Sequence, residues 1–75
     1  MNKDRRKRIE VAIDKIEQAK EELEEARDEE QEYFDNMLEP FQQGEKGEAA
    51  EAAVAALESV IGYLESAIDE AGNVE

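Results

Sequence analysis

Nine residues, 39–47, decide the fold of this chain, and they read Glu39-Pro40-Phe41-Gln42-Gln43-Gly44-Glu45-Lys46-Gly47. Pro40 lacks a backbone N–H and disfavours helix at the residue before it, and the two glycines permit turns. Apolar residues recur at helical spacing on both sides of this segment. We therefore predict a helix over about residues 4–38, a loop over residues 39–47 and a second helix over about residues 48–71.

Both predicted helices carry apolar residues at alternating spacings of three and four, a pattern typical of coiled coils. The predicted seam of the first helix consists of Ile9, Ala12, Ile16, Ala19, Leu23, Ala26, Glu30, Tyr33 and Met37. The predicted seam of the second consists of Ala50, Ala53, Leu57, Val60, Leu64, Ala67 and Ala71. When the chain folds back, we expect residues whose numbers sum to about 87 to face each other. In this register large side chains of each helix meet alanines of the other, which fills a helical core densely. The predicted fold is all-α: one domain, residues 1–75, an antiparallel two-helix hairpin with an Ala-rich, coiled-coil-like seam.

Two groups of apolar residues find no cover in such a hairpin and predict self-association. Val54, Ile61 and Ile68 form a second row on the second helix, and Ile9 and Ile13 lie where the first helix outruns the second. A hairpin of this size also buries little apolar surface to oppose the conformational entropy of folding. We expect these five residues to mediate a homodimer in the form of a four-helix bundle.

The net charge of −13 is unevenly distributed along the chain. Residues 1–8 hold five basic side chains against Asp4, whereas residues 9–75 hold four basic and 21 acidic side chains. Such a body repels nucleic acids and anionic membranes and attracts basic protein surfaces. The candidate interaction surface consists of seven acidic residues of the first helix, Glu17, Glu21, Glu24, Glu25, Asp28, Glu29 and Glu32. The alternative interpretation is that these charges only keep the helix soluble.

The basic tip, residues 3–8, places positive charge at a helix N-terminus, where the helix dipole disfavours it. The adjoining acidic body opposes nucleic-acid binding, and no set of base-reading side chains accompanies the tip. We therefore do not expect direct binding of nucleic acid. The tip is expected either to fray or to pair with the acidic stretch of another subunit.

The residue inventory argues against catalysis. The chain contains neither His nor Cys, so neither a zinc site of the usual kind nor a thiolate is available. Its side-chain hydroxyls belong to Ser59, Ser66, Tyr33 and Tyr63, and no histidine can activate them. A phosphate-binding glycine loop and an EF-hand spacing are also missing. We expect no catalytic residue, no metal and no cofactor, and therefore a protein that is not an enzyme.

The location of the protein is predicted from signals that the sequence lacks. A basic start is typical of signal peptides, but Glu10, Asp14 and Glu17 interrupt the apolar stretch that should follow. No run approaches the roughly 18 apolar residues of a membrane span. We expect a cytoplasmic protein without a membrane partner.

The sequence resembles a family of short acidic helical proteins of unknown function encoded in bacteriophage and prophage genomes. The resemblance lies in residues 28–37, DEEQEYFDNM, the Gly/Glu-containing loop after them, and the stretch from Ala56-Leu57-Glu58-Ser59 to Asp69-Glu70-Ala71. It covers most of the chain and transfers no catalytic residue. It implies an accessory protein of a phage, acting in the host cytoplasm.

Two functions are compatible with these features. The first is a noncatalytic protein that self-associates and binds a basic host or phage protein through its acidic helical surface, for example to counteract a host defence or to mimic DNA. The second is a helical bundle with a purely structural or assembly role, whose charges serve only solubility.

Overall fold

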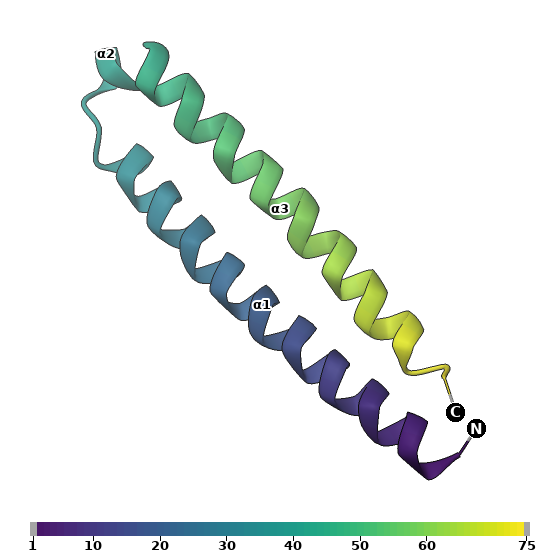
Figure 1. Cartoon of the computed structure of the whole chain (residues 1–75). Coiled ribbons are helices and arrows are strands. Elements are labelled where there is room, and N and C mark those ends of the chain that lie inside the picture. Colours follow the sequence, from purple (N-terminus) through teal and green to yellow (C-terminus); the bar gives the residue numbers. More distant parts are fainter. Residues whose placement is uncertain (1, 75) are drawn as a thin grey trace.

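The computed structural model describes residues 2–74, and within them the chain forms three helices and no strand. These are α1 (Lys3–Asp35), α2 (Glu39–Gln42) and α3 (Glu45–Ala71). The long helices α1 and α3 run antiparallel beside each other, and α2 lies at the end where they are joined (Figure 1). The molecule is a rod of 58 × 15 × 13 Å. The predicted all-α hairpin is confirmed.

The helix boundaries follow from local sequence. The side chain of Asn2 caps α1, because its Oδ1 accepts a hydrogen bond of 2.8 Å from the backbone N–H of Arg5. α1 ends at Asp35, earlier than predicted, and Leu38 has extended backbone angles. Pro40 lies in the first turn of α2, where a missing N–H is tolerated. The predicted loop therefore contains a short helix, and α3 begins earlier than expected, at Glu45.

Two contacts hold α2 in place at the end of the hairpin. The side-chain amide of Gln42 donates a hydrogen bond of 3.0 Å to the backbone carbonyl of Phe34, near the end of α1. Gly47 is buried in the first turn of α3, where a Cβ atom would collide with the backbone of Gln42. Glycine is required here because α2 crosses α3 closer than any side chain permits.

The seam between the long helices is rotated from the predicted one. On α1 the less exposed residues that follow the spacing of three and four are Ile9, Ile13, Ile16, Lys20, Leu23, Arg27, Glu30, Phe34 and, just beyond its end, Met37. On α3 they are Gly47, Ala50, Val54, Leu57, Ile61, Leu64, Ile68 and Ala71. Five of the nine predicted seam residues of the first helix and four of the seven of the second lie in the observed seam. The rest of the prediction is wrong, because Ala12, Ala19, Ala26 and Tyr33 of α1 and Val60 and Ala67 of α3 are exposed. The expectation of an Ala-rich seam is also wrong, because the observed seam contains two alanines, Ala50 and Ala71.

The seam is rotated because α3 buries its bulkier row of apolar side chains. The observed arrangement turns Val54, Ile61 and Ile68 toward α1 in place of Ala53, Val60 and Ala67, which removes more apolar surface from water. On α1 the same rotation brings Lys20 and Arg27 to the seam, where their side chains keep 26% and 27% of their exposure. Their aliphatic stems cover the seam while the charged groups reach its edge.

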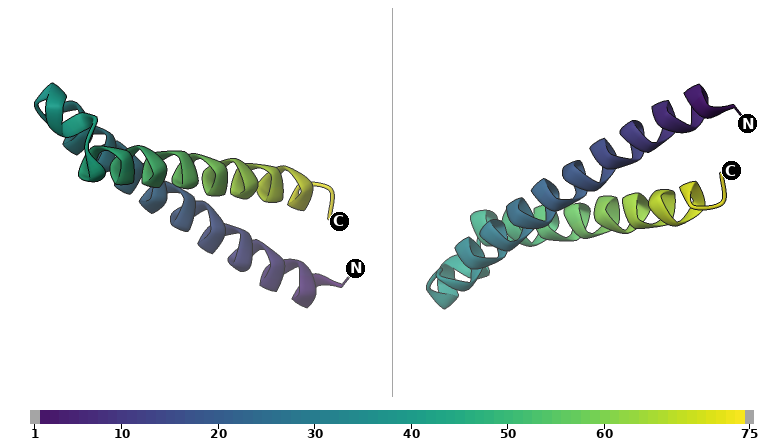
Figure 2. Two further views of the ribbon diagram at one scale, coloured as in Figure 1. Left: turned by 90° about the horizontal axis from the view of Figure 1, so that it is seen from above. Right: turned by 90° about the horizontal axis from the view of Figure 1, so that it is seen from below.

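The antiparallel register matches the predicted one. Lys20 Nζ of α1 lies 3.6 Å from Glu65 Oε1 of α3, and Phe34 lines a groove together with Val54. The helices lie close near the loop and diverge toward the chain termini (Figure 2). Among the described residues only Ala50, Val54 and Ile61 are buried hydrophobic residues. The core of the single hairpin is therefore thin.

Two glycines of α3 should respond in opposite ways to the same substitution. Gly47→Ala should destabilise the hairpin, because the new methyl group collides with the backbone of Gln42. Gly62→Ala should raise the free energy of unfolding by up to about 1 kcal/mol, because alanine is the better helix former and no atom lies within 4 Å of the added Cβ. Urea denaturation followed by circular dichroism measures both. Equal effects of the two substitutions would contradict the packing of α2 on α3.

The rotated seam can be tested with two apolar truncations. Ile61→Ala should lower the free energy of unfolding by about 2–5 kcal/mol, because Ile61 is 4% exposed and its removal leaves a cavity. The control is Val11→Ala on the outer side of α1, where Val11 is 43% exposed, and its effect should be below about 1 kcal/mol. Denaturation at one fixed protein concentration provides both values. A loss at Ile61 no larger than at Val11 would mean that the seam is placed incorrectly.

Candidate interaction surfaces

The seven residues of the predicted acidic surface all lie on α1, which brings them together along one helix. Six of them are exposed and Glu24 is half-buried beside the seam. Carboxylates four residues apart recur about every 6 Å along the helix axis. From here on, the term acidic surface denotes these residues: Glu17, Glu21, Glu24, Glu25, Asp28, Glu29 and Glu32.

Basic side chains compensate little of the acidic surface. Within residues 2–74 the structure contains two ion pairs, Lys20 with Glu65 and Arg27 with Asp28, the latter at 3.1 Å. Asp28 is thus the one member of the acidic surface that has a basic partner among the described residues. The remaining carboxylates repel one another at helical spacing, which destabilises the helix. The acidic surface therefore lowers the stability of the isolated hairpin.

One side of the seam is acidic on both helices. Gln31 of α1 and Glu51 and Glu58 of α3 line the same shallow groove. Farther along, Glu17 and Glu24 line a second groove with Ile68, and Lys20 bridges to Glu65 beside it. Each of these acids follows a seam residue directly in sequence. This side of the rod therefore continues the acidic surface from α1 onto the edge of α3.

The opposite side of the seam is apolar. In an antiparallel helix pair, the residues that directly precede Lys20, Arg27 and Phe34 on α1 share a side with those that precede Val54, Ile61 and Ile68 on α3. These six residues are Ala19, Ala26, Tyr33, Ala53, Val60 and Ala67. Five are exposed and Ala53 is half-buried, with Tyr33 at 50% and Val60 at 42%. We call them the apolar face, and it consists of residues that the sequence pattern assigned to the seam.

The predicted self-association residues lie elsewhere than expected. Val54 and Ile61 are buried and Ile68 is half-buried, all in the seam against α1, so the expectation that this row faces outward is wrong. The row turned inward because it is the bulkier one on α3. Ile9 and Ile13 are half-buried at the open end of the hairpin.

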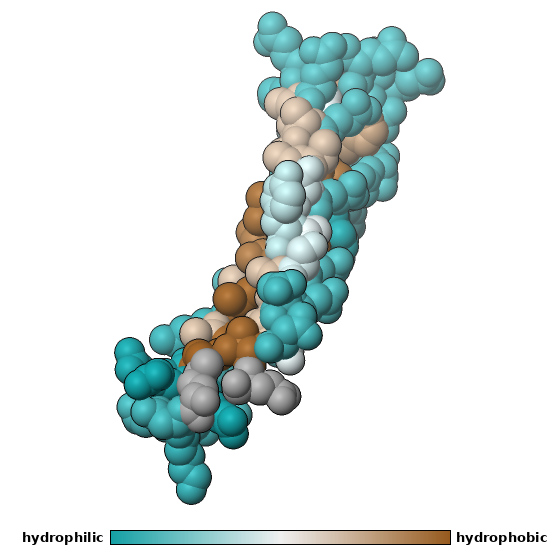
Figure 3. All heavy atoms as spheres, turned by 90° about the vertical axis from the view of Figure 1, so that its right-hand side faces the viewer, coloured by the Kyte–Doolittle hydropathy of each residue, from teal (hydrophilic) through white to brown (hydrophobic). Residues whose placement is uncertain are grey.

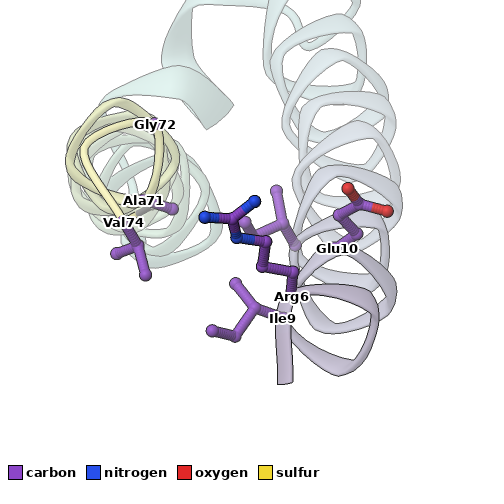
Figure 4. A pocket seen from close by; sticks show the side chains of 7 residues that line it. Arg6, Ile9, Glu10, Ala71, Gly72 and Val74 are labelled. Carbon is purple, nitrogen blue, oxygen red and sulfur yellow. The ribbon is translucent and has the colours of Figure 1, made fainter. Parts of the chain in front are cut away.

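A cleft lies at this open end, between the start of α1 and the end of α3. Ile9, Ile13 and Ala71 line it together with Arg6, Glu10, Gly72 and Val74. Arg6 and Ile9 point across the cleft toward α3, whereas the carboxylate of Glu10 points away (Figure 4). α3 thus covers part of the two isoleucines that were expected to be uncovered. The cleft exists because the helices diverge here.

The space-filling view shows how polar and apolar atoms are distributed. On the side drawn in Figure 3, hydrophobic residues form a band along the rod, with hydrophilic residues along one border and at both ends. The hydroxyl-bearing residues Ser59, Ser66, Tyr33 and Tyr63 are exposed on the helices. The described residues include no group of three or more acidic side chains placed to hold a metal ion. No helix between Asn2 and Val74 is sufficiently long and apolar for a membrane span.

Removing charge from the acidic surface should stabilise the hairpin. Glu21, Glu25 and Glu29 continue a row of like charges from Glu17, so replacing the three by Gln removes the three repulsive pairs in this row that are four residues apart. At ~0.2–0.5 kcal/mol for each pair, the free energy of unfolding should rise by about 1 kcal/mol at low salt. Added salt should reduce this difference, because it screens the repulsion in the unmodified chain. A lower stability of the Gln variant would show that these carboxylates are stabilised by contacts within the protein.

The chain was compared with known protein families, curated proteins and solved structures. No family model matches it, and no curated protein or solved structure is significantly similar to it. The resemblance to short acidic phage proteins therefore stays a prediction. The functional assignment rests on the distribution of charge and apolar surface over the hairpin.

Proposed function

We propose that this chain is a noncatalytic interaction protein that self-associates and binds a basic protein through its acidic surface. The partner class is a host or phage protein with a basic surface, such as a nucleic-acid-binding protein whose site the carboxylate rows would occupy. This proposal includes the phage context that the resemblance implies, with action in the host cytoplasm.

The observation that carries the proposal is the separation of charge between the two long helices. α1 presents the acidic surface outward and almost without counter-ions. Between Ala49 and Ile68, α3 carries three charged residues, Glu51, Glu58 and Glu65, and all three follow seam residues on one side. A protein that needed charge only for solubility would have no reason to leave the outer side of α3 uncharged. The uncharged outer side of α3 favours self-association, and the acidic surface of α1 favours a basic partner.

A second candidate function is a structural one, in which the bundle serves assembly and the carboxylates serve solubility. The thin core favours it, because three buried hydrophobic residues make a weak single hairpin that association would stabilise. The two functions share the four-helix bundle and differ in the role of the acidic surface.

Capture from a bacterial lysate, followed by reconstitution with the purified captured protein, separates the two functions. We expect a basic protein whose binding weakens steeply with salt, because its affinity rests on charge. Glu21/Glu25/Glu29→Gln should weaken the reconstituted complex at least tenfold. The matched control Glu48→Gln/Asp69→Asn/Glu70→Gln removes the same charge from the two ends of α3, outside the acidic surface and the edge that continues it, and should leave binding nearly unchanged. Equal affinity of all three proteins would reject the acidic surface as the binding site and favour the structural function.

A further inference from the structure

The apolar face, with its extension on α3, is an uncharged and mostly exposed surface of the hairpin. On α3 it continues outward through Ala49, Ala56 and Tyr63, and Tyr63 is 75% exposed. On α1 the corresponding outer positions are charged, as at Lys15, Glu22 and Glu29. The face is therefore bordered by charge on α1 and opens onto the neutral outer side of α3.

The hairpin exposes more surface than a compact monomer of the same mass. The chain exposes 5893 Å² at a mass of 8.5 kDa. A compact monomer of that mass exposes roughly 4,700 Å². The radius of gyration of the hairpin is 17.2 Å, whereas that of a compact chain of this length is about 11 Å. The excess of roughly 1,200 Å² exceeds the ~800 Å² that each partner contributes to a standard protein interface.

The charges at the two ends of the rod are complementary, and one chain cannot bring them together. The basic tip, residues 3–8, holds five basic and one acidic side chain, and residues 32–48 hold five acidic and one basic side chain. None of the basic side chains of the tip forms an ion pair within the described part of the chain. The two groups lie at opposite ends of a rod 58 Å long. A second copy in antiparallel orientation places each group beside the other, whereas a parallel copy places like charges together.

The spacing along the helices agrees with this orientation. Ala26 and Val60 lie on the same level of the rod in the register set by the Lys20–Glu65 contact. From that level Arg8 is about 27 Å away along α1, and Glu45 is about 22 Å away along α3 in the opposite direction. A two-fold axis at this level brings Arg8 of one copy to the loop end of the other, and the difference of about 5 Å lies within the reach of an arginine side chain.

We propose that the apolar face binds a second copy of this chain in antiparallel orientation, with the two-fold axis near Val60. In this arrangement Val60 meets its own counterpart, and Ala53 meets the partner's Ala67. The basic tip of each copy lies against residues 32–48 of the other. The inference rests on the self-association in the proposed function and specifies its face and direction. Apart from Glu32, which lies at the contact with the partner's tip, the acidic surface of both α1 helices remains free for a basic partner.

The first test is the native mass by sedimentation equilibrium of the full chain and two charged variants. The unmodified chain should have twice its chain mass of 8.5 kDa. Val60→Glu places a charge at the two-fold axis and should raise the dissociation constant at least tenfold with helicity retained. The matched control Gln18→Glu adds the same charge on the outer side of α1 and should change the constant less than twofold. A monomer at all concentrations, or equal effects of the two variants, would overturn the proposal.

The second test measures direction and does not depend on the stability of the Val60 variant. The chain has no cysteine, so Arg8→Cys and Glu45→Cys each introduce a single thiol. An equal mixture of the two should form mixed disulfide dimers on mild oxidation, and each variant alone should not. Disulfide formation by Arg8→Cys alone would show a parallel dimer and reject the inference. Because both tests omit the basic protein partner, their failure is distinguishable from failure of the acidic surface to bind it.

Discussion

Burial of the β-branched row of α3 against α1 is the constraint on which the rest of the structure depends. Once Val54 and Ile61 turn inward, the phase of both helices is set. Lys20 and Arg27 then come to the seam, and the alanines beside them turn outward. The same rotation places acids on one side of the seam and uncharged residues on the other. The orientation of each helix about its own axis thus determines which surface is charged and which is apolar.

The two long helices differ in the charged and the buried side chains that they carry. α1 carries most of the charged side chains and has only Lys20 and Arg27 as basic residues between Ile16 and Asp35. α3 is neutral over most of its outer circumference and supplies every buried hydrophobic residue among those described. Repulsion along α1 is tolerated because the helix is held by its neighbour and not by its own charge pattern. A surface that destabilises its own helix is typical of one kept for a function.

The sequence predicted the helical hairpin, its antiparallel register and the location of the acidic surface. Pro40 and the heptad spacing were sufficient for this, because both act locally. The face of each helix was harder to predict, since Ala53-Val54, Val60-Ile61 and Ala67-Ile68 place two candidate rows side by side. Counting apolar residues on α1 favoured the row without Lys20 and Arg27. The long stems of those residues pack in a seam, so their charge was a poor guide to exposure. The bulk of the α3 row was the better signal.

The two ends of the hairpin are held by different numbers of contacts. At the loop, Gln42 bonds Phe34 and α2 lies directly on Gly47, whereas at the termini the helices diverge around a cleft. Local separation of α1 from α3 therefore starts at the chain termini and proceeds toward the loop. Amide hydrogens near Ile9 and Ala71 then exchange with solvent long before those near Ala50. A molecule that binds across the diverging ends lengthens the lifetime of the folded hairpin, whereas one that binds at the loop changes this lifetime little.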